Sequence, residues 1–186
     1  MFQLSESDQL LLLKIARTAV LAYLSGKSAR PPEITSGPLS ETHSVFVSLH
    51  EGENELRGCI GNIHPTTPLY RTTAECAIQA AVADPRFMPL TIEELVRVGF
   101  EISVLSPMEK VDSIQTIQVG RDGLFISKDA SRGLLLPQVA TDNDWDRERF
   151  LAETCRKAGL KPNDWKEGAT IFRFTAHVFE EKRRKA

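Results

Sequence analysis

Alternation of apolar and polar residues beside a short turn is the feature that most constrains how this chain folds. Val45, Val47 and Leu49 are separated by single residues, which is the period-two pattern of a β-strand. Residues 51–54 have the composition of a hairpin turn, and a second strand is expected over residues 55–60. The segment therefore predicts a β-hairpin whose second strand and far end read ELRGCIGNIH.

Apolar residues at helical spacing, together with capping residues, predict helices elsewhere in the chain. The first helix is expected from Ser5 or Ser7 to Gly26, and the second from Thr67 as cap and Pro68 as first residue to near Asp84. A short helix is expected at a capping box of Thr91 and Glu94, and a further helix from Asp144 to Ala158. Further strands are expected at residues 98–104, 124–126, 134–136 and 171–178. This order predicts an α+β fold with a mainly antiparallel sheet flanked by helices.

Length and composition indicate one ordinary globular protein. The 186 residues fit a single compact domain over residues 1–186, either with one lobe or with two. The chain has 23 Lys and Arg against 25 Asp and Glu, and a net charge of −2 argues against a strongly nucleic-acid-binding surface. The charged run at residues 180–185 is expected to be a solvated chain end.

The sequence also sets expectations for location and cofactors. No apolar run approaches the roughly 18 residues of a membrane span, and the N-terminus has no basic leader, so a cytoplasmic protein without membrane contact is expected. Cys59, Cys76 and Cys155 are too few and too widely spaced for a disulfide framework. No CxxC pattern is present, so neither a metal site nor a cofactor is evident.

The hairpin stretch carries the residues that most suggest chemistry. Gly58 and Gly61 lack side chains, so a ligand can approach the backbone closely, and a bend there would form an anion-binding nest. Arg57 suits a carboxylate or a phosphate, and Cys59 is the candidate nucleophile if its pKa is lowered. His64 is a candidate base, or with Cys59 an incomplete metal site.

Each of these residues also has a purely structural interpretation. Cys59 can be a small buried hydrophobe, and the two glycines can mark a bulge or tight packing. Strand alternation places Leu56, Gly58 and Ile60 on one face of the strand. The opposite face then carries Arg57 and Cys59 together, which favours a polar environment for the thiol.

Other cysteines, histidines and two proline-containing stretches complete the candidates. Cys76 and Cys155 are expected in the core, and His43, His50 and His177 at the surface or hydrogen-bonded. Asp84 and Arg86 form a candidate ion pair that contacts a ligand or merely stiffens a connector. Gln138 follows a proline and either binds the polar edge of a ligand or satisfies a turn.

Five stretches in order then carry a family resemblance. They are LRGCIG at 56–61, DPRF at 84–87, EISVLSP at 101–107, LLLPQVA at 134–140, and the run from Trp145 to Leu160 with Cys155 and Gly159. On these stretches the chain resembles the AMMECR domain family, named for the Alport, midface-hypoplasia and elliptocytosis chromosomal region. The resemblance covers nearly the whole chain, from about Asp8 to Val178.

The resemblance implies a two-lobed α+β domain of unestablished activity in which LRGCIG is a suggested functional site. It also implies Memo-like and radical-SAM proteins as partners. The chain lacks the radical-SAM cysteine motif, so any cluster chemistry would belong to such a partner.

The sequence therefore leaves two alternative functions. One is an enzyme or enzyme-accessory subunit that uses the Cys59 thiol and an Arg57 contact on a nucleotide-like or other small anionic substrate. The other is a non-catalytic binding or adaptor module with a glycine-lined groove for a protein or nucleic-acid partner.

Overall fold

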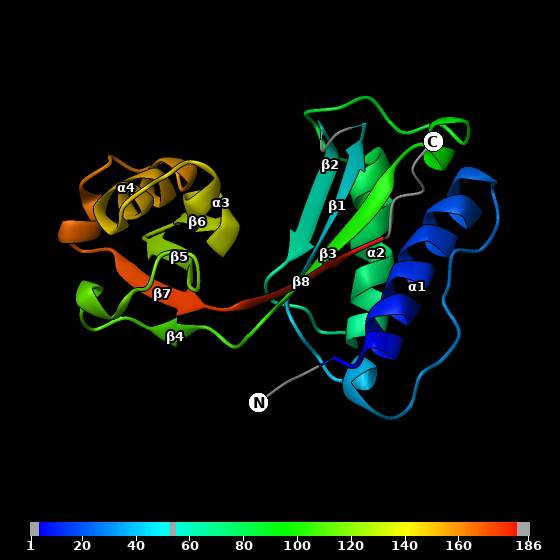
Figure 1. The fold of residues 1–186 in the computed structure, drawn as a ribbon, viewed down its shortest axis with the longest axis horizontal. Coiled ribbons are helices and arrows are strands. Elements are labelled where there is room, and N and C mark those ends of the chain that lie inside the picture. The colour runs from blue at the N-terminus through cyan, green and yellow to red at the C-terminus, as the bar shows by residue number, and fades with distance from the viewer. Residues whose placement is uncertain (1–3, 53–54, 182–186) are drawn as a thin grey trace. The chain divides into compact units, whose positions relative to one another are not determined.

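The structure is a computed structural model that describes residues 4–52 and 55–181. The chain forms two compact units, of which the first contains Met1–Val104 and His177–Ala186 and the second contains Leu105–Ala176. Within the described residues, each unit has a four-stranded sheet and two α-helices, which confirms the predicted α+β class (Figure 1). That the two units make up a single domain over residues 1–186 stays a prediction.

The first unit has a sheet whose strands lie in the order β2-β1-β3-β8. The strands are β1 (Val45–Glu51), β2 (Glu55–Asn62), β3 (Gly99–Leu105) and β8 (Ala176–Glu180). The β1–β2 and β1–β3 pairings are antiparallel, so the predicted hairpin is confirmed, although residues 53–54 of its turn lie outside the described residues. Helix α2 (Leu69–Val82) lies against β1 and β2, and helix α1 (Glu6–Leu24) lies against α2 (Figure 1).

Helix α1 begins where the sequence predicts it. The Ser5 side chain accepts a hydrogen bond from the Asp8 N–H, and the Asp8 carboxylate accepts one from the Ser5 N–H, which completes a capping box. The helix places six apolar residues in the core of the unit: Leu12, Leu13, Ile15, Ala16, Ala19 and Val20. Val45, Val47 and Leu49 of β1 belong to the same core, as their alternation predicts.

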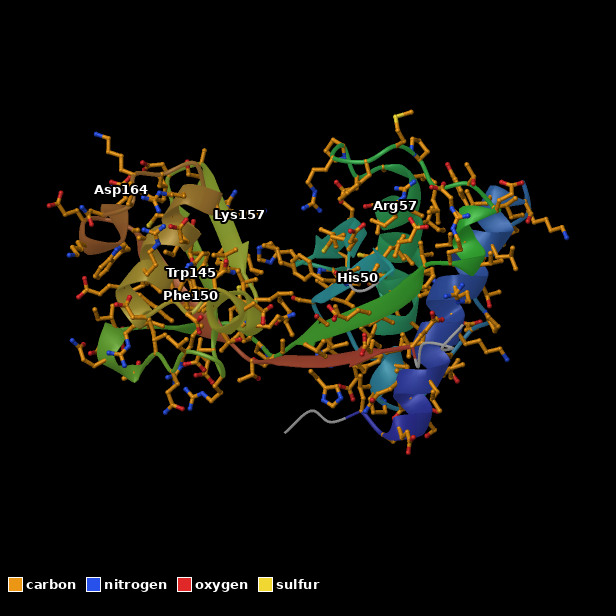
Figure 2. All side chains as sticks on the ribbon, turned by 45° about the horizontal axis from the view of Figure 1, so that its top comes forward. His50, Arg57, Trp145, Phe150, Lys157 and Asp164 are labelled. Carbon is orange, nitrogen blue, oxygen red and sulfur yellow. The ribbon has the colours of Figure 1, made fainter. Side chains whose placement is uncertain are left out.

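The second unit has a sheet in the order β4-β7-β5-β6. Its strands are β4 (Glu109–Lys110), β5 (Gly123–Lys128), β6 (Ser131–Leu135) and β7 (Thr170–Phe174), and all three of its pairings are antiparallel. Helices α3 (Pro137–Asp142) and α4 (Arg147–Lys157) complete the unit, and the core between α4 and the sheet contains Phe150 and Leu151. Figure 2 shows Phe150 among the side chains of this unit.

Several predicted boundaries were wrong. Pro68 is the N-cap of α2, and Thr67 instead bonds Thr72 Oγ1 with its own Oγ1, at 2.9 Å. The fourth helix begins only after Asp146, because that carboxylate accepts from the Arg149 N–H and caps it. The strand predicted at 171–178 is two strands, β7 and β8, which belong to different sheets.

The C-terminal charged run is less solvated than its composition indicates. Glu181 accepts hydrogen bonds from Arg17 Nε, at 2.7 Å, and from Arg17 Nη2, and a third from the Phe100 N–H at 3.2 Å. Arg17 also donates to the carbonyl oxygens of Leu95 and Val98. Glu181 therefore ties the start of this run to α1, whereas residues 182–185 of the run lie outside the described residues.

Candidate functional site

Cys59 lies on β2, the edge strand of the first sheet, directly opposite Ser48 of β1. The Ser48 hydroxyl donates a hydrogen bond to Cys59 Sγ at 3.1 Å. Ser48 is buried and Cys59 is half-buried. The thiol therefore lies beside a hydroxyl and keeps some access to solvent, in a more polar setting than that of a core cysteine.

An ion pair between Asp84 and Arg86 covers the free edge of β2 at Cys59. The Cys59 N–H donates to Asp84 Oδ2 at 2.9 Å, and the Cys59 carbonyl oxygen accepts from Arg86 Nη2 at 3.3 Å. Arg86 in turn donates to both Asp84 carboxylate oxygens, at 2.9 and 2.6 Å. The pair thus satisfies the backbone groups that an edge strand would leave open, and it joins the DPRF stretch to LRGCIG.

The two members of this ion pair differ in their access to solvent. The Asp84 side chain is 2% exposed, whereas that of Arg86 is 51% exposed. The Arg86 guanidinium holds the pKa of Asp84 well below its usual range, so the carboxylate is ionised at neutral pH. Arg86 therefore presents a fixed and accessible positive charge next to Cys59.

The Cys59 thiol is not activated in this state. Burial raises the pKa of Cys59, while the hydrogen bond from Ser48 and the charge of Arg86 lower it by less. Asp84 and Glu101 raise the pKa further. The condition that the sequence sets for a nucleophile, a lowered pKa, is not met, and the thiol is protonated at neutral pH.

The other two cysteines are core residues, as predicted. Cys76 is 3% exposed and Cys155 is 0% exposed. Burial raises the pKa of Cys76 to about 12, and it also raises the pKa of Cys155. Both thiols are therefore internal references for the reactivity of Cys59.

The two glycines serve packing. Both lie inside β2 without a positive φ angle, so they form no bend and no nest there. A Cβ atom on Gly58 would lie 2.1 Å from the carbonyl oxygen of Ala80 in α2, and one on Gly61 would lie 2.2 Å from the ring of Phe46. Gly58 therefore lets α2 approach the sheet, and Gly61 makes room for an aromatic ring.

A register shift corrects the predicted faces of β2. Leu49 pairs with Gly58 but its neighbour His50 pairs with Leu56, so Arg57 is an extra residue in a β-bulge. Leu49 and His50 point to opposite faces, and their partners follow them. Leu56 therefore does not share a face with Gly58 and Ile60, whereas Cys59 does lie opposite the core face, as predicted.

Arg57 is bound within the protein. Its Nη1 donates to the Met88 carbonyl oxygen at 2.9 Å, and its Nη2 reaches the Glu94 carboxylate at 3.3 Å. The Arg57 side chain is 15% exposed, and Figure 2 labels it in the first unit. The Thr91 N–H donates to Glu94 and, with Arg57, lowers the pKa of that carboxyl group. Arg57 thus anchors the connector after α2, and the predicted capping box of Thr91 and Glu94 is confirmed.

Sequence reasoning missed two neighbours of Cys59. Ser48 pairs with Cys59 on one side and with Glu101 of β3 on the other, so the three side chains form a row across the face opposite the core. Alternation alone places Ser48 and Glu101 on the non-core faces of their strands. Without the bulge, the register set by the hairpin turn would pair Ser48 with Gly58. The extra residue in β2 therefore brings Ser48 opposite Cys59.

Gln138 and His64 each take part in a hydrogen bond within their own stretch of the chain. Gln138 belongs to α3 of the second unit, where its carbonyl oxygen accepts from Thr141 Oγ1. His64 is exposed after β2, and its N–H bonds Asn62. His50, labelled in Figure 2, departs from the expectation of a surface or bonded histidine, because both ring nitrogens are buried without a hydrogen-bond partner among the described residues.

The described part of the chain has neither a metal-binding cluster nor a membrane-spanning helix. Within residues 4–52 and 55–181, no three or more His, Cys, Asp or Glu side chains gather as a metal ion would require. In the same part of the chain, no helix is long and apolar enough to cross a membrane. The absence of a cofactor stays a prediction.

Fold and site together define a two-unit α+β protein whose edge strand presents a thiol framed by an Asp–Arg pair. A family model described as AMMECR1 matches residues 13–179. A Pyrococcus abyssi protein is 45% identical over 92% of this chain and 89% of its own length. A crystal structure of an uncharacterised Pyrococcus horikoshii protein matches with a TM-score of 0.86 at 44% identity, over 92% of this chain and 90% of that one. The chain belongs to the AMMECR1 family.

Proposed function

We propose that the face of the first sheet around Cys59 binds a small anionic molecule, with Arg86 as the anion contact and the Cys59 thiol as the group that meets the ligand. The observation that carries this proposal is the row of Cys59, Ser48 and Glu101 beside the half-exposed Arg86. Both arginines are paired with a carboxylate, but the Arg57 side chain expected from the sequence is only 15% exposed, whereas that of Arg86 is 51% exposed, so Arg86 takes the place of Arg57 as the anion contact.

The same row supports a covalent step in an enzyme or an enzyme-accessory subunit. Side chains directly opposite each other on neighbouring strands have Cβ atoms about 4.5–5.5 Å apart, within reach of a glutamate. In this step Cys59 Sγ forms a bond to an electrophilic carbon of the ligand, and the leaving group on that carbon departs with the bonding electron pair. The Ser48 hydroxyl, which donates to Sγ at rest, turns to Glu101, so that it accepts the thiol proton and passes its own proton to the Glu101 carboxylate. Because the resting thiol is protonated, the step depends on this proton acceptor.

The test compares two alkylating reagents that differ in charge. Iodoacetate is anionic and iodoacetamide is neutral, so the ratio of their rates at Cys59, divided by the ratio for free cysteine, measures the attraction of an anion to the site. We expect a raised ratio that falls roughly fivefold in Arg86→Gln, the scale of one unit charge a few ångströms away. Arg57→Gln is the matched control and should leave the ratio unchanged, because the Arg57 side chain is only 15% exposed and is bound to Glu94 and to the Met88 carbonyl oxygen.

The two buried cysteines serve as internal references that distinguish reaction at the site from unfolding of the protein. Mass spectrometry separates alkylation of Cys59 from that of Cys76 and Cys155, which report on unfolding because both are buried. An unchanged ratio in Arg86→Gln, with both reference thiols still protected, would contradict the proposal. An equal fall of this ratio in Arg57→Gln would show that the overall charge of the protein, and not Arg86 in particular, attracts the anionic reagent.

A non-catalytic binding module is the second candidate. The raised pKa of Cys59 favours it, whereas the filled spaces at Gly58 and Gly61 leave no glycine-lined groove there. The partners to test are Memo-like and radical-SAM proteins, which the family resemblance suggests. Under this hypothesis Cys59→Ala keeps partner capture in a pull-down and Arg86→Gln loses it. Loss of capture in Cys59→Ala with an unchanged melting temperature would favour the thiol chemistry.

A further inference from the structure

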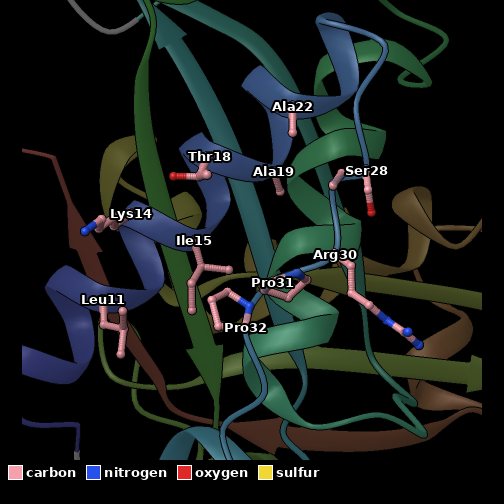
Figure 3. A pocket seen from close by; sticks show the side chains of 11 residues that line it. Leu11, Lys14, Ile15, Thr18, Ala19, Ala22, Ser28, Arg30, Pro31 and Pro32 are labelled. Atoms are coloured by element: carbon pink, nitrogen blue, oxygen red, sulfur yellow. The ribbon is translucent and has the colours of Figure 1, made fainter.

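A groove with an apolar floor lies along α1, on the first unit. It has a volume of about 220 Å³ and runs between α1 and the segment that contains Pro31 and Pro32 (Figure 3). Ile15 and Ala19, which are 6% and 4% exposed, form part of its floor, and Ala22 lines its far end. The groove is therefore recessed below the surface of α1.

The apolar surface extends beyond this groove. Helix α1 carries four large apolar side chains that are more than a third exposed: Leu10, Leu11, Leu21 and Tyr23. Leu11 also lines the groove. Leu11 therefore adds exposed apolar surface at the rim of the groove, whereas Leu10, Leu21 and Tyr23 do not line it.

Charge distinguishes this region from the rest of the molecule. Residues 9–32 contain four Lys and Arg and no Asp or Glu, although the whole chain has a net charge of −2. Arg17 is paired with Glu181, and within the described residues no ion pair joins Lys14, Lys27 or Arg30. Figure 3 shows the Lys14 and Arg30 side chains pointing away from the groove on opposite sides.

We propose that this groove is a docking site for an acidic amphipathic helix of a partner protein. The apolar anchors of such a helix would occupy the floor, and its carboxylates would meet Lys14 and Arg30 on the two rims. The lining of α1 from Leu11 to Ala22 spans about 16 Å, which matches about three turns of a docked helix.

A concave floor favours a helix over a membrane surface. Side chains of a peptide reach the recessed Ile15 and Ala19, whereas a flat anionic bilayer contacts only the exposed rim. The net charge of −2 also opposes the approach of the whole chain to an anionic bilayer.

The experiment measures fluorescence anisotropy with a labelled peptide of about 12 residues, with leucines spaced three and four apart and glutamates elsewhere. We expect saturable binding in low salt that weakens roughly tenfold in Lys14→Glu/Arg30→Glu, the scale of two lost surface ion pairs. Ala22→Arg, which fills the groove, should have at least that effect. The control Lys110→Glu/Arg132→Glu makes the same charge change in the second unit and should bind normally.

Other outcomes would overturn the proposal. These are absence of saturable binding, or equal affinity of the wild-type chain and Lys14→Glu/Arg30→Glu for the peptide. Binding to phosphatidylserine vesicles in place of the peptide would assign the surface to a membrane. Self-association that Ala22→Arg abolishes, without peptide binding, would assign it to a second copy. If Ala22→Arg fails to fold by circular dichroism, the double charge variant decides, because both its positions are exposed.

Discussion

Replacing Gly58 by alanine tests whether this glycine exists for packing or for a ligand. The added Cβ would lie 2.1 Å from the Ala80 carbonyl oxygen and 3.1 Å from its carbonyl carbon. Real Cβ atoms essentially never approach another heavy atom closer than 3.0 Å. Because the Cβ would lie 2.1 Å from the oxygen, α2 and β2 must separate by about 0.9 Å to reach that limit. The obstacle is backbone of a helix in the core, so no side-chain rotation relieves it.

The expected cost follows from the rigidity of a packed core. Overpacking costs about 1–3 kcal/mol, and a clash that only a helix displacement relieves belongs at the upper end. We therefore expect Gly58→Ala to lower the free energy of unfolding by about 3 kcal/mol and the melting temperature by roughly 6–12 °C. Urea denaturation and circular dichroism measure both quantities.

Gly61 provides the matched control. The atoms nearest to a Cβ there belong to the Phe46 ring, the first at 2.2 Å, so Phe46→Ala should recover part of the cost of Gly61→Ala. Ala80→Gly should not recover Gly58→Ala, because it leaves the obstructing carbonyl oxygen in place. A Gly58→Ala protein within about 0.5 kcal/mol of the wild type, with its core thiols still protected, would refute the packing argument.

Two further predictions concern ion pairs. Arg86 holds the pKa of Asp84 below its unfolded value of about 3.9, so the stability from this carboxylate is complete above about pH 4 and is lost as the pH falls towards the lowered value. The stability gap between the wild type and Asp84→Asn should therefore narrow below about pH 4 in acid titrations of unfolding, and a constant gap would contradict the ion pair. Glu181→Gln should cost about 2 kcal/mol, because it weakens charge-assisted bonds to Arg17, and an unchanged urea midpoint would show that the contact adds no stability.

Local pattern determined most of the fold. Three features could be predicted because each depends on residues near one another in sequence: the capping box of α1, the alternation of Val45, Val47 and Leu49, and the hairpin. The start of α2 and the division of the last predicted strand could not be predicted in this way. Pro68 replaces Thr67 as the cap, and β7 and β8 join different sheets, which depends on distant strands.

The sequence by itself determined only the candidates, which are a thiol between two glycines and, as a separate stretch, the pair of Asp84 and Arg86, because local pattern shows residue types and not their distant partners. Tertiary structure decided how they are used. Burial, which depends on distant parts of the chain, raises the pKa of Cys59. The close approach of α2 leaves no room for a Cβ atom at position 58, which is why a glycine is needed there. A one-residue bulge sets Cys59 against Ser48, because a shift of one residue in register reverses the face of every later side chain.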